Sequence, residues 1–159
     1  MSLRERIQTD IATAMRGGDA LRRDVLRMAL NSAYTVEKRQ GAPLTDEEYI
    51  AVLSREVKTR RESVEAFRGA GREDLATKEE AEIAILGEYL PEALGEAELS
   101  ALVAEGIAAT GASSARDLGK VMGWLSPRTR GRADGKVVSG MVAAALAQSD
   151  LAGHDVGTH

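Results

Sequence analysis

Residues 20–68 read ALRRDVLRMALNSAYTVEKRQGAPLTDEEYIAVLSREVKTRRESVEAFR, and this stretch determines the expected fold class. Apolar residues recur at three- and four-residue steps on both sides of the Gly-Ala-Pro break at 41–43, which is the period of an amphipathic helix. The Thr-Asp-Glu-Glu sequence at 45–48 fits a capping box, the pairing of side chains and backbone N–H groups that starts many helices. We therefore predict two long helices, over 19–39 and 45–68, that form an antiparallel hairpin.

The same helical period continues through the rest of the chain, without the two-residue alternation typical of strands. Further helices are expected over 3–16, 72–89, 96–110, 114–126 and 134–149. Pro91 disfavours helix for the residue before it, so we place a domain boundary there. We expect an all-α protein: an N-terminal helical domain with a long helical hairpin over 1–90, a small three-helix C-terminal domain over 91–149, and a disordered tail over 150–159.

Side chains that commonly bind metals or carry catalysis are scarce. The chain has no cysteine, which excludes disulfides, thiolate zinc sites and a cysteine nucleophile. Its two histidines, His154 and His159, lie in the expected tail, so the body lacks the commonest general base and the commonest metal ligand. We therefore expect no metal site and no cofactor.

Catalytic motifs are also missing from the sequence. The nearest approach to a phosphate-binding loop is Gly-Arg-Ala-Asp-Gly-Lys-Val at 131–137, which has the wrong spacing and no Ser or Thr after the lysine. The carboxylates at 46–48 and 79–82 have the spacing of solvated helix faces and helix N-termini. We therefore assign no catalytic residue and expect the protein to work by binding rather than by catalysing a reaction alone.

The distribution of apolar residues indicates the location of the protein. No apolar run approaches the roughly 20 residues of a membrane helix, and no apolar signal segment follows the N-terminus. The net charge of −4 gives no overall attraction to nucleic acid or to anionic membrane. We therefore expect a soluble protein of the cytoplasm with no membrane partner.

One segment departs from the acidic balance of the chain. Residues 116–136 hold six cationic side chains against two acidic ones, Asp117 and Asp134. Three of the arginines precede the last expected helix, whose N-terminal N–H groups and dipole favour an anion. The segment is either a phosphate-contacting patch or a solvated loop with scattered arginines. The residues that would bind nucleic acid are Lys120, Arg128, Arg130, Arg132 and Lys136.

A second basic cluster, Arg55, Lys58, Arg60 and Arg61, lies on the helix expected over 45–68 and is interleaved with glutamates. Side chains three and four residues apart share a helix face, so members of this cluster would lie side by side. Two interpretations stay open: a second binding patch, or an ordinary solvated face.

Gly119 and Gly123 lie four residues apart inside the helix expected over 114–126. A glycine inside a helix lowers its stability by about 1 kcal/mol relative to alanine, so we expect the pair to serve a close contact that larger side chains would block. The smooth face would admit either another helix of the same domain or a partner. The neighbouring Trp124 is expected at the edge of a core, and without nearby aromatics it argues against a module that stacks single-stranded RNA.

Several spaced motifs resemble the YqeY family. In the C-terminal half they are Asp-Leu-Gly-Lys-Val-Met-Gly at 117–123, Pro127, Gly131 and Ala-Asp-Gly-Lys-Val-Val at 133–138. In the N-terminal half they lie at 55–63, 71–75 and 82–91. The resemblance covers roughly residues 1–148. The C-terminal part is also similar to the tail domain of GatB, the B subunit of the tRNA-dependent amidotransferase.

The resemblance implies a helical N-terminal domain followed by a small helical domain like the GatB tail, which is associated with tRNA. It also implies a grouping with carbon–nitrogen ligases that use glutamine as amide donor. This chain lacks the large catalytic domain that activates the carboxylate with ATP, and any glutamine-hydrolysing part. The ligase activity therefore cannot belong to this chain alone.

Three functions follow as hypotheses. The first is a module that binds tRNA or another structured RNA through phosphate contacts. The second is an accessory role in amidotransfer, with amidotransferase or other protein subunits as partners. The third is a protein–protein adaptor that uses the long helical hairpin.

Overall fold

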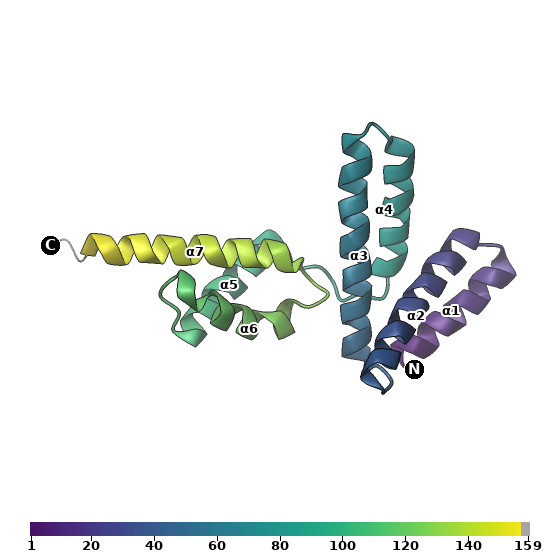
Figure 1. Cartoon of the computed structure of the whole chain (residues 1–159), viewed down its shortest axis with the longest axis horizontal. Coiled ribbons are helices and arrows are strands. Elements are labelled where there is room, and N and C mark those ends of the chain that lie inside the picture. Colours follow the sequence, from purple (N-terminus) through teal and green to yellow (C-terminus); the bar gives the residue numbers. More distant parts are fainter. Residues whose placement is uncertain (157–159) are drawn as a thin grey trace. The chain divides into compact units, whose positions relative to one another are not determined.

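The computed structural model describes the backbone of residues 1–156 and the side chains of residues 1–149. Within these residues every regular element is a helix, so the all-α prediction is confirmed (Figure 1). The helices are α1 (Leu3–Gly17), α2 (Ala20–Gln40), α3 (Asp46–Gly69), α4 (Glu73–Gly87), α5 (Glu96–Thr110), the short 3-10 helix η1 (Ala115–Asp117), α6 (Leu118–Thr129) and α7 (Gly135–Val156).

Local sequence sets the ends of the first helices. The predicted capping box of α3 is confirmed, because the Thr45 hydroxyl accepts from the N–H of Glu48 and the Glu48 carboxylate accepts from the N–H of Thr45. α1 begins with a second capping box of the same kind. α1 and α2 are followed by Gly18 and Gly41, each with φ of 74°, a left-handed conformation that glycine adopts without steric cost.

The chain forms two compact units, Met1–Pro91 and the residues from Glu92 onward, called here the N-terminal and C-terminal units. In the N-terminal unit, α1 packs along α2 and α3 packs along α4 (Figure 1). All four helices contribute to one hydrophobic core. Its buried members are Ile7, Val25, Leu26, Ala29, Ala33, Tyr49, Val52, Leu53, Val57, Ile85, Leu86 and Tyr89.

The predicted hairpin of α2 with α3 is wrong, because α3 makes its most extensive contact with α4. Figure 1 shows α4 running beside α3, whereas α2 runs beside α1. The buried face of α3 continues as far as Val64, near the C-terminal end of the helix. Gly71, with φ of 74°, then helps to reverse the chain so that α4 folds back along α3. The long helical hairpin of this unit is therefore α3–α4.

The C-terminal unit packs α5, α6 and α7 around a second core. The buried members of this core are Leu99, Val103, Val121, Leu125, Val138, Val142 and Leu146. The buried Gly106 of α5 lies against the indole ring of Trp124. A Cβ atom added at Gly106 would lie 2.9 Å from a ring carbon, which is closer than carbon atoms pack. α5 and α6 therefore approach each other closely because residue 106 has no side chain.

The end of α6 differs from the sequence prediction. The helix does not stop before Pro127 but includes it and ends at Thr129. A proline inside a helix removes one hydrogen bond and crowds the carbonyl four residues earlier. Here that carbonyl belongs to the exposed Gly123. The Ser126 hydroxyl donates to the carbonyl of Met122 at 2.7 Å, which gives the last turn an additional hydrogen bond.

α7 continues to Val156, past the end expected near Ser149. No proline interrupts this stretch, and a helix that has started gains one backbone hydrogen bond for each residue added. The tail predicted to be disordered over 150–159 is therefore helical as far as Val156. Residues 157–159 lie outside the described part of the chain.

Candidate nucleic-acid interface

The cationic segment of the C-terminal unit is separated along the chain from most of that unit's acidic residues. Four of the six acidic side chains in residues 92–149 precede residue 106, whereas all six cationic ones lie between Arg116 and Lys136. Among the described side chains, no carboxylate lies within 4.0 Å of these six cations. The ion pairs of the described residues all belong to the N-terminal unit.

The two acidic residues of the segment bond to backbone amides instead of cations. Asp117 accepts hydrogen bonds from the N–H groups of Ser113 and Ser114, at 2.9 and 3.3 Å, and these bonds lower the pKa of Asp117. Asp134 accepts from the N–H of Lys136 at 2.9 Å, as a cap of α7. The carboxylate of Asp134 thus occupies the helix N-terminus that was expected to attract an anion. Anion binding here must therefore rely on side chains.

Arg128 stacks on Trp124, one turn earlier in α6. Its guanidinium carbon lies 3.7 Å from the centroid of the indole ring, and its Nη1 donates to the carbonyl of Trp124. Residues four apart face the same side of a helix, which makes this contact possible. Stacking engages the face of the guanidinium and leaves N–H groups at its edge. Because Arg128 is exposed, these edge groups can donate to an anion in solvent.

Arg132 bonds to a distant part of the chain, the segment that precedes α5. Its Nε donates to the carbonyl of Glu92 at 3.0 Å, and its own carbonyl accepts from the N–H of Leu94 at 2.8 Å. These bonds fasten the segment that leads into α5 to the turn between α6 and α7. Gly131, with φ of 76°, shapes this turn. Arg132 is half-buried, so we assign it a positioning role beside the exposed cations.

The other predicted cations are exposed and lie on two helices and the turn between them. Lys120 and Arg128 belong to α6, where eight residues correspond to about 12 Å along the axis. Arg130 directly follows α6, and Lys136 lies in the first turn of α7. The structure thus places Arg128, Arg130 and Lys136 around the junction between α6 and α7. Lys120 lies apart from them, near the beginning of α6.

The tight-packing interpretation of Gly119 and Gly123 is wrong within the described chain. Both residues are exposed, and a Cβ atom added at either position would have no neighbouring atom within 4 Å. The glycine that allows a close helix approach is Gly106 instead. Sequence spacing missed it because a single glycine inside a helix carries no periodic signal.

Replacing Gly106 and Gly123 with alanine is expected to have opposite effects on the stability of the C-terminal unit. Gly123→Ala should stabilise by about 1 kcal/mol, because its Cβ enters open space and alanine favours helix. Gly106→Ala should destabilise by about 1 kcal/mol net. The added methyl group crowds Trp124, and this cost exceeds the free energy gained from the higher helix propensity of alanine. Urea unfolding followed by the fluorescence of Trp124, the only tryptophan, measures both. Equal stabilisation by the two substitutions would contradict the close contact of α5 with α6.

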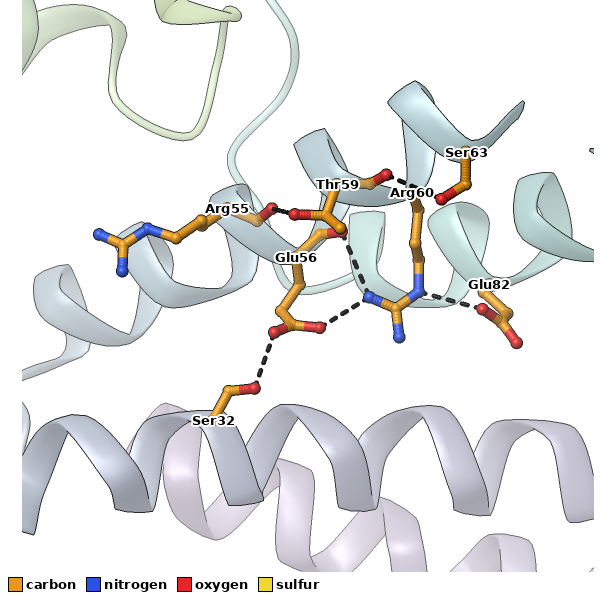
Figure 2. Close-up of polar contacts among 7 residues, drawn as sticks. All are labelled: Ser32, Arg55, Glu56, Thr59, Arg60, Ser63 and Glu82. Carbon is orange, nitrogen blue, oxygen red and sulfur yellow. Dashed lines mark hydrogen bonds and ion pairs between the residues drawn. The ribbon is translucent and has the colours of Figure 1, made fainter. Parts of the chain in front are cut away.

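The second basic cluster does not form one surface, because Arg60 is buried. Figure 2 shows its guanidinium between two carboxylates: Nη1 lies 2.7 Å from Glu56 and Nε lies 3.1 Å from Glu82. Nη1 also donates to the backbone carbonyl of Glu56 at 3.2 Å, and the Ser32 hydroxyl donates to the Glu56 carboxylate at 2.7 Å. This network links α2, α3 and α4. Arg60 therefore has a structural role and is removed from the predicted binding patch.

The remaining members of that cluster are exposed but face different neighbours. Arg55 lines a cleft between α3 and α2, whereas Arg61 lines a cleft between α3 and α4. Lys58 is exposed on the same helix. Figure 2 shows Arg55 pointing away from the Arg60 network.

Neither a membrane-spanning helix nor a metal-binding cluster is found in the described residues. No helix among them is long and apolar enough to cross a bilayer. No three or more of their His, Asp and Glu side chains gather in a way that suits a metal ion. The features that remain define a class: a two-unit all-α protein whose C-terminal unit carries cations without carboxylate partners.

Comparison with known sequences identifies the family within this class. The chain belongs to the YqeY family: the model of the family described as Yqey-like protein matches residues 4–146. The chain is 31% identical over 137 residues to "Altered inheritance of mitochondria protein 41, mitochondrial" of Pyrenophora tritici-repentis, covering 84% of this chain and 75% of that protein. It is 37% identical over 67 residues to an uncharacterized protein of Schizosaccharomyces pombe, covering 42% of this chain and 54% of that protein. The first relative's name places that protein in mitochondria, and the cytoplasmic location of this chain stays a prediction.

Proposed function

We propose that the protein binds tRNA or another structured RNA through the cationic segment 116–136 of its C-terminal unit. The observation that carries this proposal is that the described side chains offer none of these cations a carboxylate partner. Cations that are free in this way can neutralise phosphates and release the counterions around them, which drives binding. The resemblance of this part to the GatB tail supports tRNA as the class of ligand.

The exposed cations have a common role in this proposal. Lys120, Arg128, Arg130 and Lys136 contact phosphates, and such contacts position an RNA without reading its bases. Arg128 is held in place by Trp124, so less side-chain freedom is lost when it binds. Arg132 shapes the turn that presents Arg130.

An accessory role in amidotransfer is compatible with this proposal, since an RNA-binding module can serve a larger enzyme. The family resemblance to carbon–nitrogen ligases supports it, and the activity would then belong to the assembled complex. A helical adaptor for other proteins is the remaining alternative. Pull-downs with and without nuclease distinguish an RNA-binding module from a protein adaptor. Partners held through RNA are lost after nuclease treatment, whereas partners of an adaptor are retained.

Fluorescence anisotropy with labelled bulk tRNA at low salt tests the proposed function directly. Arg128→Ala combined with Arg130→Ala should weaken binding by about a hundredfold, because each of the two charged hydrogen bonds lost contributes about 1.5 kcal/mol. Arg16→Ala combined with Arg27→Ala removes the same charge from exposed sites on α1 and α2 and serves as the matched control. Absent binding of the natural chain, or equal losses in both double variants, would overturn the proposal.

A further inference from the structure

A polar cleft lies between α2 and α3 in the N-terminal unit, with a volume of about 230 Å³. Residues at helical spacing on the two facing helices line it: Ser32, Thr35, Val36 and Arg39 from α2, and Val52, Arg55 and Glu56 from α3. The cleft therefore has an arginine on each wall, contributed by different helices. Sequence patterns could not pair Arg39 with Arg55, because only the packing of α2 against α3 brings them to one cleft.

Both arginines are free of internal partners. Arg39 and Arg55 are exposed, neither has a carboxylate within 4.0 Å, and neither guanidinium donates a hydrogen bond to another described residue. The carboxylate that also lines the cleft, Glu56, is already engaged by Arg60 and by the hydroxyl of Ser32. Glu56 is thus paired at contact distance with a buried cation, which it shares with Glu82, and neither cleft arginine has a carboxylate of its own within 4.0 Å.

We propose that this cleft binds a phosphate group between the guanidinium groups of Arg39 and Arg55. Guanidinium presents N–H groups in a planar fork that matches phosphate oxygens. A phosphate presents oxygens in several directions, so two arginines on opposite walls can bind it together, whereas a carboxylate presents two oxygens in one plane. The phosphate belongs either to an RNA backbone or to a free phosphate or phosphate monoester. The site lies outside the C-terminal segment and does not depend on the RNA binding proposed there.

Titration of the isotope-labelled full chain with inorganic phosphate tests the site. Proton–nitrogen correlation spectra resolve arginine Nε–Hε groups, and Arg39→Lys and Arg55→Lys assign the two signals. We expect the signals of Arg39 and Arg55 to shift along a saturating curve, while those of Arg16 and Arg27 stay unchanged relative to chloride at equal ionic strength. Shifts that do not saturate, or that are equal for all four arginines, would overturn the proposal.

Binding of bulk tRNA then identifies the source of the phosphate. Arg39→Ala with Arg55→Ala is compared with the control Arg16→Ala with Arg27→Ala, which removes the same charge outside the cleft. The site is assigned to an RNA phosphate if the cleft variant loses about tenfold in tRNA affinity and the control loses less. The slope of log affinity against log salt concentration should then also be smaller in magnitude by about one. Unchanged tRNA affinity with saturable phosphate shifts assigns it to a free phosphate or a monoester. Because Arg128 and Arg130 are intact in these variants, failure of this site leaves the test of the C-terminal segment unaffected.

Discussion

Replacing Arg60 with methionine is expected to lower the unfolding free energy of the N-terminal unit by about 3 kcal/mol. The side chains of Arg60, Glu56 and Glu82 are 7%, 23% and 14% exposed, so the substitution leaves two largely buried carboxylates without their cation. Removing one member of a buried ion pair costs far more than the pair contributes, because the remaining charge has lost both water and partner. Burial, and then the nearby Glu82, raise the pKa of Glu79, whereas Arg60 acts to lower it, so the substitution also removes a cation that favours the charged form of Glu79.

Two further variants distinguish the network from a general loss of packing. Combining Arg60→Met with Glu56→Gln and Glu82→Gln should restore stability to within about 1 kcal/mol, because neutral side chains carry no uncompensated charge. Arg61→Met is the matched control, since the adjacent Arg61 is exposed and should change stability by about 0.5 kcal/mol or less. The three tyrosines all lie in the N-terminal unit and the single tryptophan lies in the C-terminal unit, so tyrosine fluorescence follows this unfolding separately. A similar loss for Arg61→Met and Arg60→Met would contradict the role of the network.

Binding of tRNA is expected to weaken on the order of a hundredfold when salt rises from about 50 to about 200 mM. In a plot of log affinity against log salt concentration, each phosphate contact contributes a slope of about −0.7 to −0.9. The four exposed cations proposed to contact phosphates therefore predict a total slope near −3. No described carboxylate pairs with these cations, so salt acts on their contacts with RNA and not on internal ion pairs.

The slope of log affinity against log salt concentration is compared between the natural chain and a double variant. Arg128→Ala with Arg130→Ala should reduce its magnitude by about two, because two phosphate contacts are lost. Fluorescence of Trp124 should change on binding, because a phosphate bound at the edge of the stacked Arg128 guanidinium alters the charge beside the indole ring. A slope near zero would show that the contact with RNA is not made through phosphates, and the proposed interface would then be wrong.

The all-α class and most helix positions could be predicted from the sequence, because they depend on residues that are neighbours along the chain. The capping box at Thr45 involves atoms within three residues of each other, so this prediction was confirmed. The end of α6 did not follow. Pro127 usually ends a helix, but here the carbonyl that its ring crowds belongs to an exposed glycine, so the helix continues for two more residues.

The candidate site was only partly predictable, because charge alone does not reveal exposure. Arg60 and Arg61 are adjacent and identical in type, yet one is buried between two carboxylates and the other is exposed. Arg39 was not among the sequence candidates, since its partner across the cleft lies on another helix. Gly119 and Gly123 were noticed through their spacing, although the glycine in close contact is Gly106.

The sequence by itself determined the all-α class, the chain reversals at glycines and the concentration of cations at residues 116–136, because each of these depends on composition or on short-range hydrogen bonds. Only the tertiary structure decided that α3 pairs with α4, that Arg60 is internal and that Arg39 and Arg55 share a cleft. The physical reason is that burial and charge pairing depend on which helix faces meet, and residues far apart along the chain decide that.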